Sequence, residues 1–472
     1  MRKYILMTLI VFMFACTLTP RQVKPTAPTN APEPVSTAST QPGQSKAPIS
    51  APTNTAPRPT TQSPISMPNI RGVFGSPITF ATHAEFDGYG FQWGPSDGDL
   101  GAIPVGNGNY VFYGSGGSES SCPDAPKTHD AEGVFTFSGT LDHVTGGNGC
   151  GRVFGFGDAP SGWVFDRDYA GGGQVVRFAA NGKSGWLMSF HSEYQWKNMT
   201  NPPSYLCKVG NTTSQVPCFY STVGLAVSTD NGKTFQVVGE IAEPSQPLSV
   251  FETGAGYMDV GDGSLVVADA NGKHLDNPPA DPRAAYFYLF FEDRSPGLPG
   301  ACAATDCLAV ARASYADVIA AAFSGDPYRV ATLFHKYDAT PPDPWTQPAT
   351  SDTPNLTGTA GKFSPLWTDE GAYDPVVLYD KSFDAYLAVY LFADGFKVRA
   401  SSDMLHWSKP INAGYFDPDH ELFYPTLIGE TGDPTIGGTS PRIYFSSFPT
   451  GAFPNYKTAV FESIPLILSR GY

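Results

Sequence analysis

The chain has 472 residues and a formal net charge of -15, with 50 Gly, 44 Pro and 13% aromatic residues. A nucleic-acid binder needs a basic surface to displace counterions from phosphates, and the acidic balance argues against one. Helix-forming runs are scarce, and many short β-branched and aromatic runs are separated by Gly, Pro, Asn and Asp. This pattern predicts strands joined by turns.

The N-terminus predicts export. Arg2 and Lys3 form a short positive region, and the apolar stretch 4–15 is too short to span a bilayer as a helix. The stretch ends in Met-Phe-Ala-Cys, which resembles a bacterial lipobox, where a small residue precedes the cysteine that receives lipid. We expect residues 1–16 to be a signal segment lipidated at Cys16, which places the protein at the cell surface or on the periplasmic side of a bacterial membrane. An ordinary cleaved signal peptide followed by secretion is the alternative.

Residues 17–68 are predicted to be a disordered linker. They consist mainly of Pro, Thr, Ser, Ala and Gln, and they cannot bury enough apolar surface to offset the entropy of folding. Their proline content favours an extended, stiff spacer of roughly 3 Å per residue. The folded part is then a single domain, 69–472, whose length of about 400 residues allows a large core.

The cysteines suit an oxidising setting. When Cys16 is set aside, an even number remains of the seven in the chain. Neighbours in sequence are expected to pair because each pair brackets a loop: Cys122 with Cys150, Cys207 with Cys218, and Cys302 with Cys307. Other pairings stay open. A zinc site is the alternative, but no Cys-x-x-Cys or Cys/His ligand spacing is present, and no metal ligands are predicted.

An aromatic-rich run recurs five times along the domain. The runs span 109–116, 185–194, 286–294, 385–393 and 442–449. One apolar run precedes each of them and another follows it. Five such units, spaced by about 60 to 90 residues, predict an all-β, five-bladed propeller with about four strands per blade. A β-sandwich with irregular insertions is the alternative.

Two turns resemble motifs of carbohydrate-active propellers. The segment 228–235, STDNGKTF, resembles the Asp-box of sialidases and related propellers. The segment 401–407, SSDMLHW, is similar to the Ser-x-Asp-x-x-x-Trp turn of five-bladed glycoside hydrolases of families 32, 43 and 68. Both resemblances imply that the aspartates, Asp230 and Asp403, bind turn amides on the outside of blades rather than substrate.

Further segments resemble other propellers. DGDLGAIPV followed by NYVFYGSG resembles a family associated with endo-D-arabinan cleavage, whose first blade presents Asp-Leu-Gly and then Phe-Gly-Asp. Asp99 matches the first carboxylate, and Ser115 stands where the second would be. YAGGGQVV followed by FHSEY resembles uncharacterised bacterial five-bladed proteins, in which a Gly-rich strand precedes His-x-Glu.

The propeller channel supplies the candidate site, because the first strand of each blade lines it and can bring carboxylates together. Glycosidases need one ionised and one protonated carboxyl group. We expect Asp99 to be the general base or nucleophile, Glu193 the general acid, and Asp259 a third catalytic carboxylate. The predicted substrate-binding residues are Trp93, Asp168, Tyr169, His191, Asp374 and Trp367. Each also has a structural interpretation, since acidic residues at strand ends often accept turn amides and loop tryptophans often anchor small cores.

The sequence therefore predicts a surface-anchored glycoside hydrolase that acts on a polysaccharide through paired carboxylates. A non-catalytic carbohydrate-binding or adhesion lipoprotein is the alternative, which Ser115 favours. We expect a monomer with no cofactor and no nucleic-acid partner, attached to the membrane by its lipid alone. A structural Ca²⁺ at the channel, which related propellers often carry, stays open without assigned ligands because no contiguous calcium loop is present.

Overall fold

The computed structural model describes residues 67–94, 97–118, 132–195, 206–208, 215–217, 219–246, 260–294, 298–303, 305–351, 360–393, 395–412, 414–453 and 455–471. The chain divides into two units, Met1–Thr61 and Gln62–Tyr472, and the described residues all belong to the second. The predicted signal segment, Cys16 and nearly all of the linker lie outside them. Within the described ranges, no helix has the length and apolar character needed to cross a bilayer.

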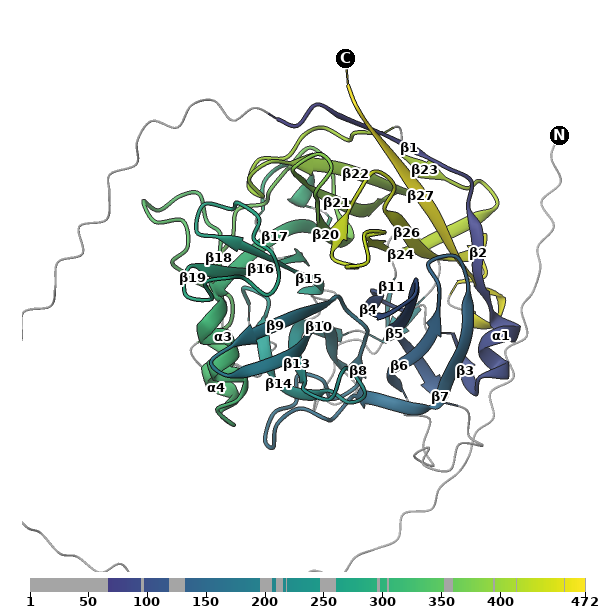
Figure 1. Ribbon diagram of the computed structural model, residues 1–472, viewed down its shortest axis with the longest axis horizontal. Helices are drawn as coiled ribbons and strands as arrows, with labels where there is room; N and C mark the ends of the chain where they lie inside the picture. The colour runs from purple at the N-terminus through teal and green to yellow at the C-terminus, as the bar shows by residue number, and fades with distance from the viewer. Residues whose placement is uncertain are drawn as a thin grey trace, which may run out of the picture. The chain divides into compact units, whose positions relative to one another are not determined.

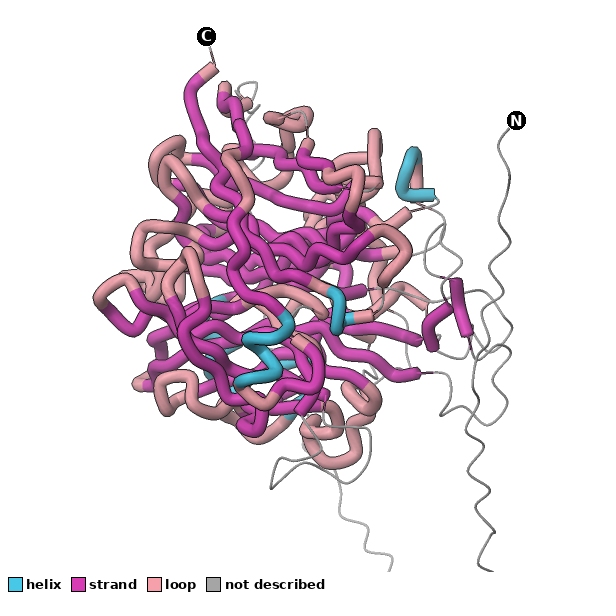
Figure 2. Tube along the Cα trace, turned by 90° about the vertical axis from the view of Figure 1, so that its right-hand side faces the viewer, coloured by secondary structure: helices cyan, strands magenta, loops and turns pink. Residues whose placement is uncertain are grey.

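The second unit is a five-bladed β-propeller. Its described strands form five sheets of five strands each and one two-stranded sheet. Viewed down the shortest axis, the five larger sheets follow one another around a common centre (Figure 1). From the side, nearly all of the regular structure is strand, with a few short helices (Figure 2). The propeller predicted from the five repeated runs is confirmed, and a sandwich of two stacked sheets is excluded.

The five blades use the following strands. Blade 1 has β3 (Phe91–Trp93), β4 (Gly101–Gly106), β5 (Asn109–Ser118), β6 (Glu132–Gly139) and β7 (Val144–Gly155). Blade 2 has β8 (Tyr169–Ala170), β9 (Val175–Ala180), β10 (Lys183–Gln195), β13 (Phe219–Ser228) and β14 (Gln236–Ala242). Blade 3 has β15 (Val260–Asp269), β16 (Ala285–Asp293), β17 (Cys307–Ser314), β18 (His335–Lys336) and β19 (Gln347–Pro348).

Blade 4 has β20 (Tyr373–Asp380), β21 (Ala385–Phe392), β22 (Gly395–Ser401), β23 (Tyr415–Phe416) and the short parallel partner β25 (Ile436–Gly437). Blade 5 has β24 (His420–Ile428), β26 (Arg442–Pro449), β27 (Val460–Arg470), β1 (Ile70–Phe74) and β2 (Ile78–Thr82). The two-stranded sheet pairs β11 (Leu206–Lys208) with β12 (Gln215–Pro217).

The five aromatic-rich runs are the second strands of the five blades, β5, β10, β16, β21 and β26. Their large side chains are buried because each of these strands lies inside its sheet and faces a neighbouring blade on either side. The described helices are α1 (His83–Gly88), α3 (Tyr315–Ala322) and α4 (Pro327–Ala331), with 3₁₀ turns at Gly300–Ala303 and Tyr456–Thr458. The apolar run that follows β16 is strand from Cys307 to Ser314, after which α3 begins.

Blade 5 closes the ring with both ends of the domain. The last strand, β27, pairs with β26 along one edge. Along its other edge, β27 pairs with β1 and β2 from the start of the domain. Because strands from opposite ends of the domain share one sheet, an antiparallel ladder of backbone hydrogen bonds fastens the circle of blades.

Polar side chains join the inner strands of neighbouring blades. The amide of Leu265 donates to Gln174 Oε1 at 2.8 Å, which links blade 3 to blade 2. The amide of Val377 donates to Ser264 Oγ at 3.0 Å, which links blade 4 to blade 3. The amide of Leu100 donates to Thr426 Oγ1 at 2.9 Å, which links blade 1 to blade 5. These buried bonds fix the inner strands in one common register around the axis.

The turn between β13 and β14 is held by its own aspartate. Asp230 accepts hydrogen bonds from the amide of Thr234 at 3.1 Å and from its hydroxyl at 2.7 Å. The next aromatic residue, Phe235, is buried and meets the ring of Tyr113 in blade 1 edge to face. The Tyr113 hydroxyl donates to the carbonyl of Gly232 at 2.9 Å. The turn therefore fastens blade 2 to blade 1, which is a structural role for Asp230.

One predicted disulfide is confirmed and the others are not tested. Cys302 and Cys307 are bonded and both are buried. Cys150 is also disulfide-bonded, and its expected partner Cys122 lies outside the described residues. The side chains of the third expected pair, Cys207 and Cys218, lie outside them too.

Candidate active site

Four blades place a polar side chain at the same position relative to the inner-strand hydrogen bonds. The amides that link neighbouring blades belong to Leu100, Leu265 and Val377. Counting back three residues from each of these amides gives Asp97, Asp262 and Asp374. Thr426 of blade 5 and Ser264 of blade 3 are both side-chain acceptors of such amides. The residue two places before Ser264 is Asp262, and the residue two places before Thr426 is Tyr424. These four residues therefore occupy corresponding positions of blades 1, 3, 4 and 5.

The backbone at three of these positions is unusual. Asp262, Asp374 and Tyr424 have φ values of 48°, 46° and 55°. Each lies at a shift in strand register, on β15, β20 and β24 respectively. A bulge of this kind lifts a residue out of the ladder and re-aims its side chain. Aspartate tolerates the left-handed region, but for an aromatic residue it is a strained conformation of the type that collects at functional sites.

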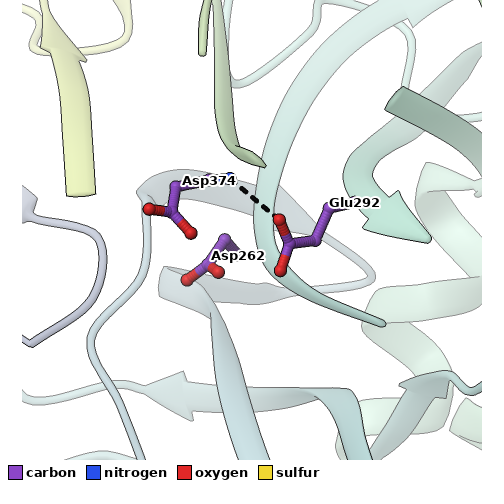
Figure 3. Close-up of side chains that lie close together, drawn as sticks. All are labelled: Asp262, Glu292 and Asp374. Atoms are coloured by element: carbon purple, nitrogen blue, oxygen red, sulfur yellow. Dashed lines mark hydrogen bonds between the residues drawn. The ribbon is translucent and has the colours of Figure 1, made fainter. Parts of the chain in front are cut away.

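The bulges bring three carboxyl groups together. Carboxylate oxygens of Asp262, Glu292 and Asp374 all lie within 4.8 Å of one another. Figure 3 shows the three side chains converging from separate strands, with the amide of Asp374 donating to Glu292 Oε2 at 2.8 Å. Asp262 and Glu292 are almost fully buried, and Asp374 is partly buried.

Asp99 lies beside this group. None of its surface is exposed, and the hydroxyl of Thr426 lies 3.4 Å from its Oδ1. Burial raises the pKa of Asp99 well above its ordinary value, and the charges of Asp262 and Asp374 raise it further. We call Asp99, Asp262, Glu292 and Asp374 the inner carboxylates. Asp99 was expected to act as the base, but a substrate cannot reach a fully covered carboxyl group. Asp99 therefore lies beneath the site, out of contact with solvent.

Asp97, two residues earlier, is only partly buried and is held by tyrosines. Its Oδ1 accepts a hydrogen bond of 2.7 Å from the hydroxyl of Tyr424 and a second from the hydroxyl of Tyr456. The hydroxyl of Tyr169 donates to the backbone carbonyl of Asp97. Burial, followed by the charge of Asp97, raises the pKa of all three tyrosines well above the ordinary value. The phenols therefore keep their protons and act as donors.

Glu193 faces the same region from β10. Its side chain keeps 15% of its surface exposed, and its Oε1 lies 3.5 Å from His191 Nε2. Burial raises the pKa of Glu193, the hydrogen bond and charge of His191 lower it, and the charge of Asp97 raises it again. The other ring nitrogen of His191 lies 3.9 Å from Asp262 Oδ2. His191 thus stands between Glu193 and the inner carboxylates.

Ser115 has a packing role at the position where the arabinan-cleaving pattern has a carboxylate. Its hydroxyl is buried and accepts a 2.6 Å hydrogen bond from the amide of Gly172 in blade 2. A Cβ added at Gly172 would lie 2.4 Å from the carbonyl oxygen of Asp99. The backbones of blades 1 and 2 therefore approach closely here, and a small side chain bridges them.

The remaining predicted site residues divide into three groups. Tyr169 and His191 contact each other edge to face with ring centroids 5.8 Å apart, so they lie together at the site. Asp168 accepts the amide of Gln195 at 2.7 Å and thereby supports the end of β10. Asp259 and the side chain of Trp93 lie outside the described residues.

Trp367 is placed in a core. It is 6% exposed, and it packs against Tyr390 and Trp407, with the guanidinium of Arg399 over its ring at 4.7 Å. A sugar ring needs an open aromatic face for stacking. The structure therefore gives Trp367 a packing role in the seam between blades 3 and 4.

Sequence reasoning missed Asp97, Asp262, Tyr424 and Tyr456. A repeated tetrapeptide could have indicated the first two, because Asp97-Gly98-Asp99-Leu100 and Asp262-Gly263-Ser264-Leu265 share the pattern Asp-Gly-x-Leu. In blade 3, Asp262 lies at the register shift, whereas Ser264, two places on, accepts the amide of Val377. No local sequence signal marks Tyr456, whose contact with Asp97 joins residues 359 positions apart.

Comparisons with known proteins found structural neighbours of low identity. The catalytic domain of a GH62 α-L-arabinofuranosidase from Coprinopsis cinerea aligns with a TM-score of 0.40 and 10% identity over 84% of this chain and 97% of that chain. A family 117 glycoside hydrolase from the marine bacterium Zobellia galactanivorans aligns with a TM-score of 0.43 and 8% identity over 85% of this chain and 91% of that one.

Levansucrase from Bacillus subtilis, in complex with oligosaccharides, aligns with a TM-score of 0.43 and 12% identity over 83% of this chain and 86% of that one. No family model matches the sequence, and no curated protein matches it either. The propeller itself is shown by the arrangement of its sheets.

Proposed function

We propose that this protein is a glycoside hydrolase in which Glu193 is the general acid and Asp97 is the base or nucleophile. The observation that carries the proposal is the contrast between these two neighbouring carboxyl groups. Asp97 accepts two phenol hydroxyls at one oxygen, whereas burial and the charge of Asp97 raise the pKa of Glu193. Two carboxyl groups in unlike environments are what acid–base cleavage of a glycosidic bond requires.

In this mechanism Glu193 gives its proton to the oxygen of the leaving sugar as the glycosidic bond breaks. Asp97 either attacks the anomeric carbon or removes a proton from the water that does so. The hydroxyls of Tyr424 and Tyr456 hold Asp97 Oδ1, which leaves Oδ2 as the oxygen available for that step. His191 orients the Glu193 carboxyl group.

The base is assigned to Asp97 in place of Asp99 because of access. Asp99 has no exposed surface, while Asp97 is partly exposed at the corresponding position of blade 1. Tyr169 is buried, contacts His191 and donates to the Asp97 carbonyl, so its proposed role is to position these two residues. Asp374 keeps its proposed place near the site through Tyr424, whose amide lies 3.3 Å from its Oδ2.

The proposed substrate is a neutral or cationic polysaccharide outside the cell. The net charge of -15 disfavours binding of polyanions. Lipidation at Cys16 and a stiff linker over 17–68 would hold the monomeric domain away from a bacterial membrane. Radiolabelled palmitate that enters the wild-type chain but not Cys16→Ser would support this location, and equal labelling of both would remove it.

Carbohydrate binding without catalysis is the second candidate, and one observation favours it. Ser115 occupies the place of the second carboxylate in the arabinan-cleaving pattern and is committed to the amide of Gly172. On this alternative, the partly exposed surface around Asp97 and Glu193 binds sugar and no bond is broken.

The test is a digest of a panel of polysaccharides with the purified full chain, read as reducing sugar released. We expect release from at least one member, loss of that release in Asp97→Asn and in Glu193→Gln, and no change in the exposed control Asp87→Asn. Both substitutions keep the shape of the side chain, so the melting temperature checks the fold. Full activity in Asp97→Asn would contradict the mechanism. Binding of a panel member without any release would establish the second candidate.

A further inference from the structure

An aromatic cluster on blade 5 lies beside Asp97 and takes no part in the proposed acid–base step. Phe423 of β24 and Phe453, in the loop between β26 and β27, stack with ring centroids 4.2 Å apart and an angle of 22° between their planes. Both residues are partly exposed. We call Phe423 and Phe453 the aromatic pair.

The aromatic pair is connected to Asp97 from two directions. Tyr424 directly follows Phe423 and donates to Asp97 Oδ1 at 2.7 Å. Tyr456 contacts the ring of Phe453 edge to face, with centroids 6.3 Å apart, and donates to the same carboxylate oxygen. A polysaccharide chain that reaches Asp97 can therefore extend over the aromatic pair.

The bulge in β24 accounts for this arrangement. Neighbouring residues of a regular strand point to opposite faces of the sheet. At the register shift between Phe423 and Thr426, however, the backbone of Tyr424 is left-handed, and the ring centroids of Phe423 and Tyr424 are only 5.9 Å apart. The bulge thus places the hydroxyl that holds Asp97 next to an apolar ring, in a strained conformation of the kind that collects at functional sites.

The aromatic pair is held in place by its surroundings. Phe448 of β26 is fully buried and meets Phe423 and Phe453 edge to face, with centroids 5.6 Å and 5.3 Å away. The amide of Thr450, at the start of the loop, donates to the carbonyl of Asp419 at 3.0 Å. Because the rings are fixed before a ligand arrives, binding to them costs little conformational entropy.

We propose that the aromatic pair is a sugar-binding subsite, on which a neutral sugar residue stacks next to the residue that is cleaved at Asp97. Aromatic rings pack against the apolar C–H face of a sugar ring, and phenylalanine offers no polar group to a charged one. Two aromatic residues that the sequence predicts to bind sugar, Tyr169 and Trp367, are both buried and leave this role open. The inference rests on the proposed function and adds a subsite to it.

The experiment measures binding without cleavage, by affinity electrophoresis of the full chain through gels that contain the polysaccharides of the panel. All chains carry Glu193→Gln, so that the polysaccharide stays intact. Phe453→Leu keeps an apolar side chain but removes the aromatic face, whereas Phe453→Trp keeps an aromatic face but adds bulk. A residue that only packs should tolerate Leu better than Trp, and a residue that stacks on sugar should show the reverse. Tyr328→Leu on α4, at a residue that is 52% exposed, is the control.

We expect Phe453→Leu to weaken binding of a neutral polysaccharide by about three- to tenfold, whereas Phe453→Trp and Tyr328→Leu bind like the parent chain. In the wild-type background, Phe453→Leu should raise KM and leave kcat nearly unchanged. The proposal is overturned if the parent chain binds no neutral polysaccharide, if Phe453→Leu binds as the parent does, or if Phe453→Trp loses as much affinity as Phe453→Leu. Binding that depends on Phe453 in a chain that releases no reducing sugar would leave the subsite standing and remove the hydrolase.

Discussion

The hydroxyl of Tyr424 donates a 2.7 Å hydrogen bond to Asp97 Oδ1, although the two residues are 327 positions apart in the chain. Tyr424 reaches Asp97 because the ring of blades is closed: blade 5, in which β27 pairs with β1 and β2, lies next to blade 1. Its backbone is in the left-handed region, which few aromatic residues adopt. The closure of the ring and the strained bulge together position one carboxylate.

Replacement of Tyr424 by Phe removes one of the two hydroxyls that hold Asp97. A hydrogen bond to a charged group is worth about 1.5–3 kcal/mol, which corresponds to a fall in kcat/KM of roughly 10- to 150-fold. Reducing-sugar kinetics on the polysaccharide that is cleaved would measure it. Tyr328→Phe, at a residue that is 52% exposed, is the control. Wild-type kcat/KM in Tyr424→Phe would show that the hydroxyl does not position the base.

Replacement of His191 by Phe keeps an aromatic ring against Tyr169 but removes the imidazole. Since His191 lowers the pKa of Glu193 through its hydrogen bond and charge, the variant raises that pKa. A general acid must be protonated, so the basic limb of kcat/KM against pH should move to higher pH. His143→Phe, which loses a comparable contact with Glu85 at the surface, should leave the limb in place. If the basic limb does not move in His191→Phe, His191 does not influence the pKa of Glu193.

Asp166 gives a test of stability against pH. Burial raises its pKa to about 7 from an ordinary value of 3.8, although its Oδ2 accepts the amide of Ala159 at 2.8 Å. The folded chain therefore binds this proton more tightly than the unfolded chain does. The contribution of Asp166 to the free energy of unfolding is greatest at low pH and declines as the pH rises from 3.8 to about 7.

Asp166→Asn cannot lose a proton, so it removes this decline. The free energy of unfolding of the variant minus that of the wild type should increase across the same pH window, as measured by urea unfolding. Asp281→Asn at an exposed turn is the control. A flat difference for Asp166→Asn would mean that its carboxyl group is ionised in the folded chain throughout the window.

Substitution of Trp367 tests whether this residue packs in the core or binds sugar. Because its ring is enclosed by Tyr390, Trp407 and Arg399, Trp367→Phe should lower the free energy of unfolding by about 1–3 kcal/mol. The KM for the cleaved polysaccharide should not change, since little of the indole is open to ligand. A large rise in KM with an unchanged melting temperature would restore the stacking role expected from the sequence.

The fold was largely accessible from the sequence because each blade repeats the same signal. The five aromatic runs became β5, β10, β16, β21 and β26, with their bounds close to those expected. The closure of the ring by β1 and β2 could not be predicted from the sequence. It depends on pairing with β27, about 400 residues away, and no periodicity encodes such a pairing. The helix α3 was also missed, because its first residues directly continue the run of β17.

The site was accessible only in part. The sequence identified the first strand of blade 1, but the pattern Asp-Gly-Asp-Leu does not indicate which of its two aspartates is exposed to solvent. A strand period of two would put Asp97 and Asp99 on one face. The structure separates them, because Asp99 is covered and its hydroxyl neighbour Thr426 belongs to another blade. Register shifts at Asp262, Asp374 and Tyr424 likewise cannot be inferred from composition or spacing.

The division of roles between Glu193 and Asp97 is tested most directly with aryl glycosides of whichever sugar the polysaccharide digest releases. A dinitrophenolate leaves without a proton, whereas a sugar alcohol does not. We expect Glu193→Gln to lose most of its kcat on the polysaccharide but to keep activity on the dinitrophenyl glycoside, and Asp97→Asn to be inactive on both. Equal loss on the two substrates in Glu193→Gln, or activity in Asp97→Asn, would contradict it.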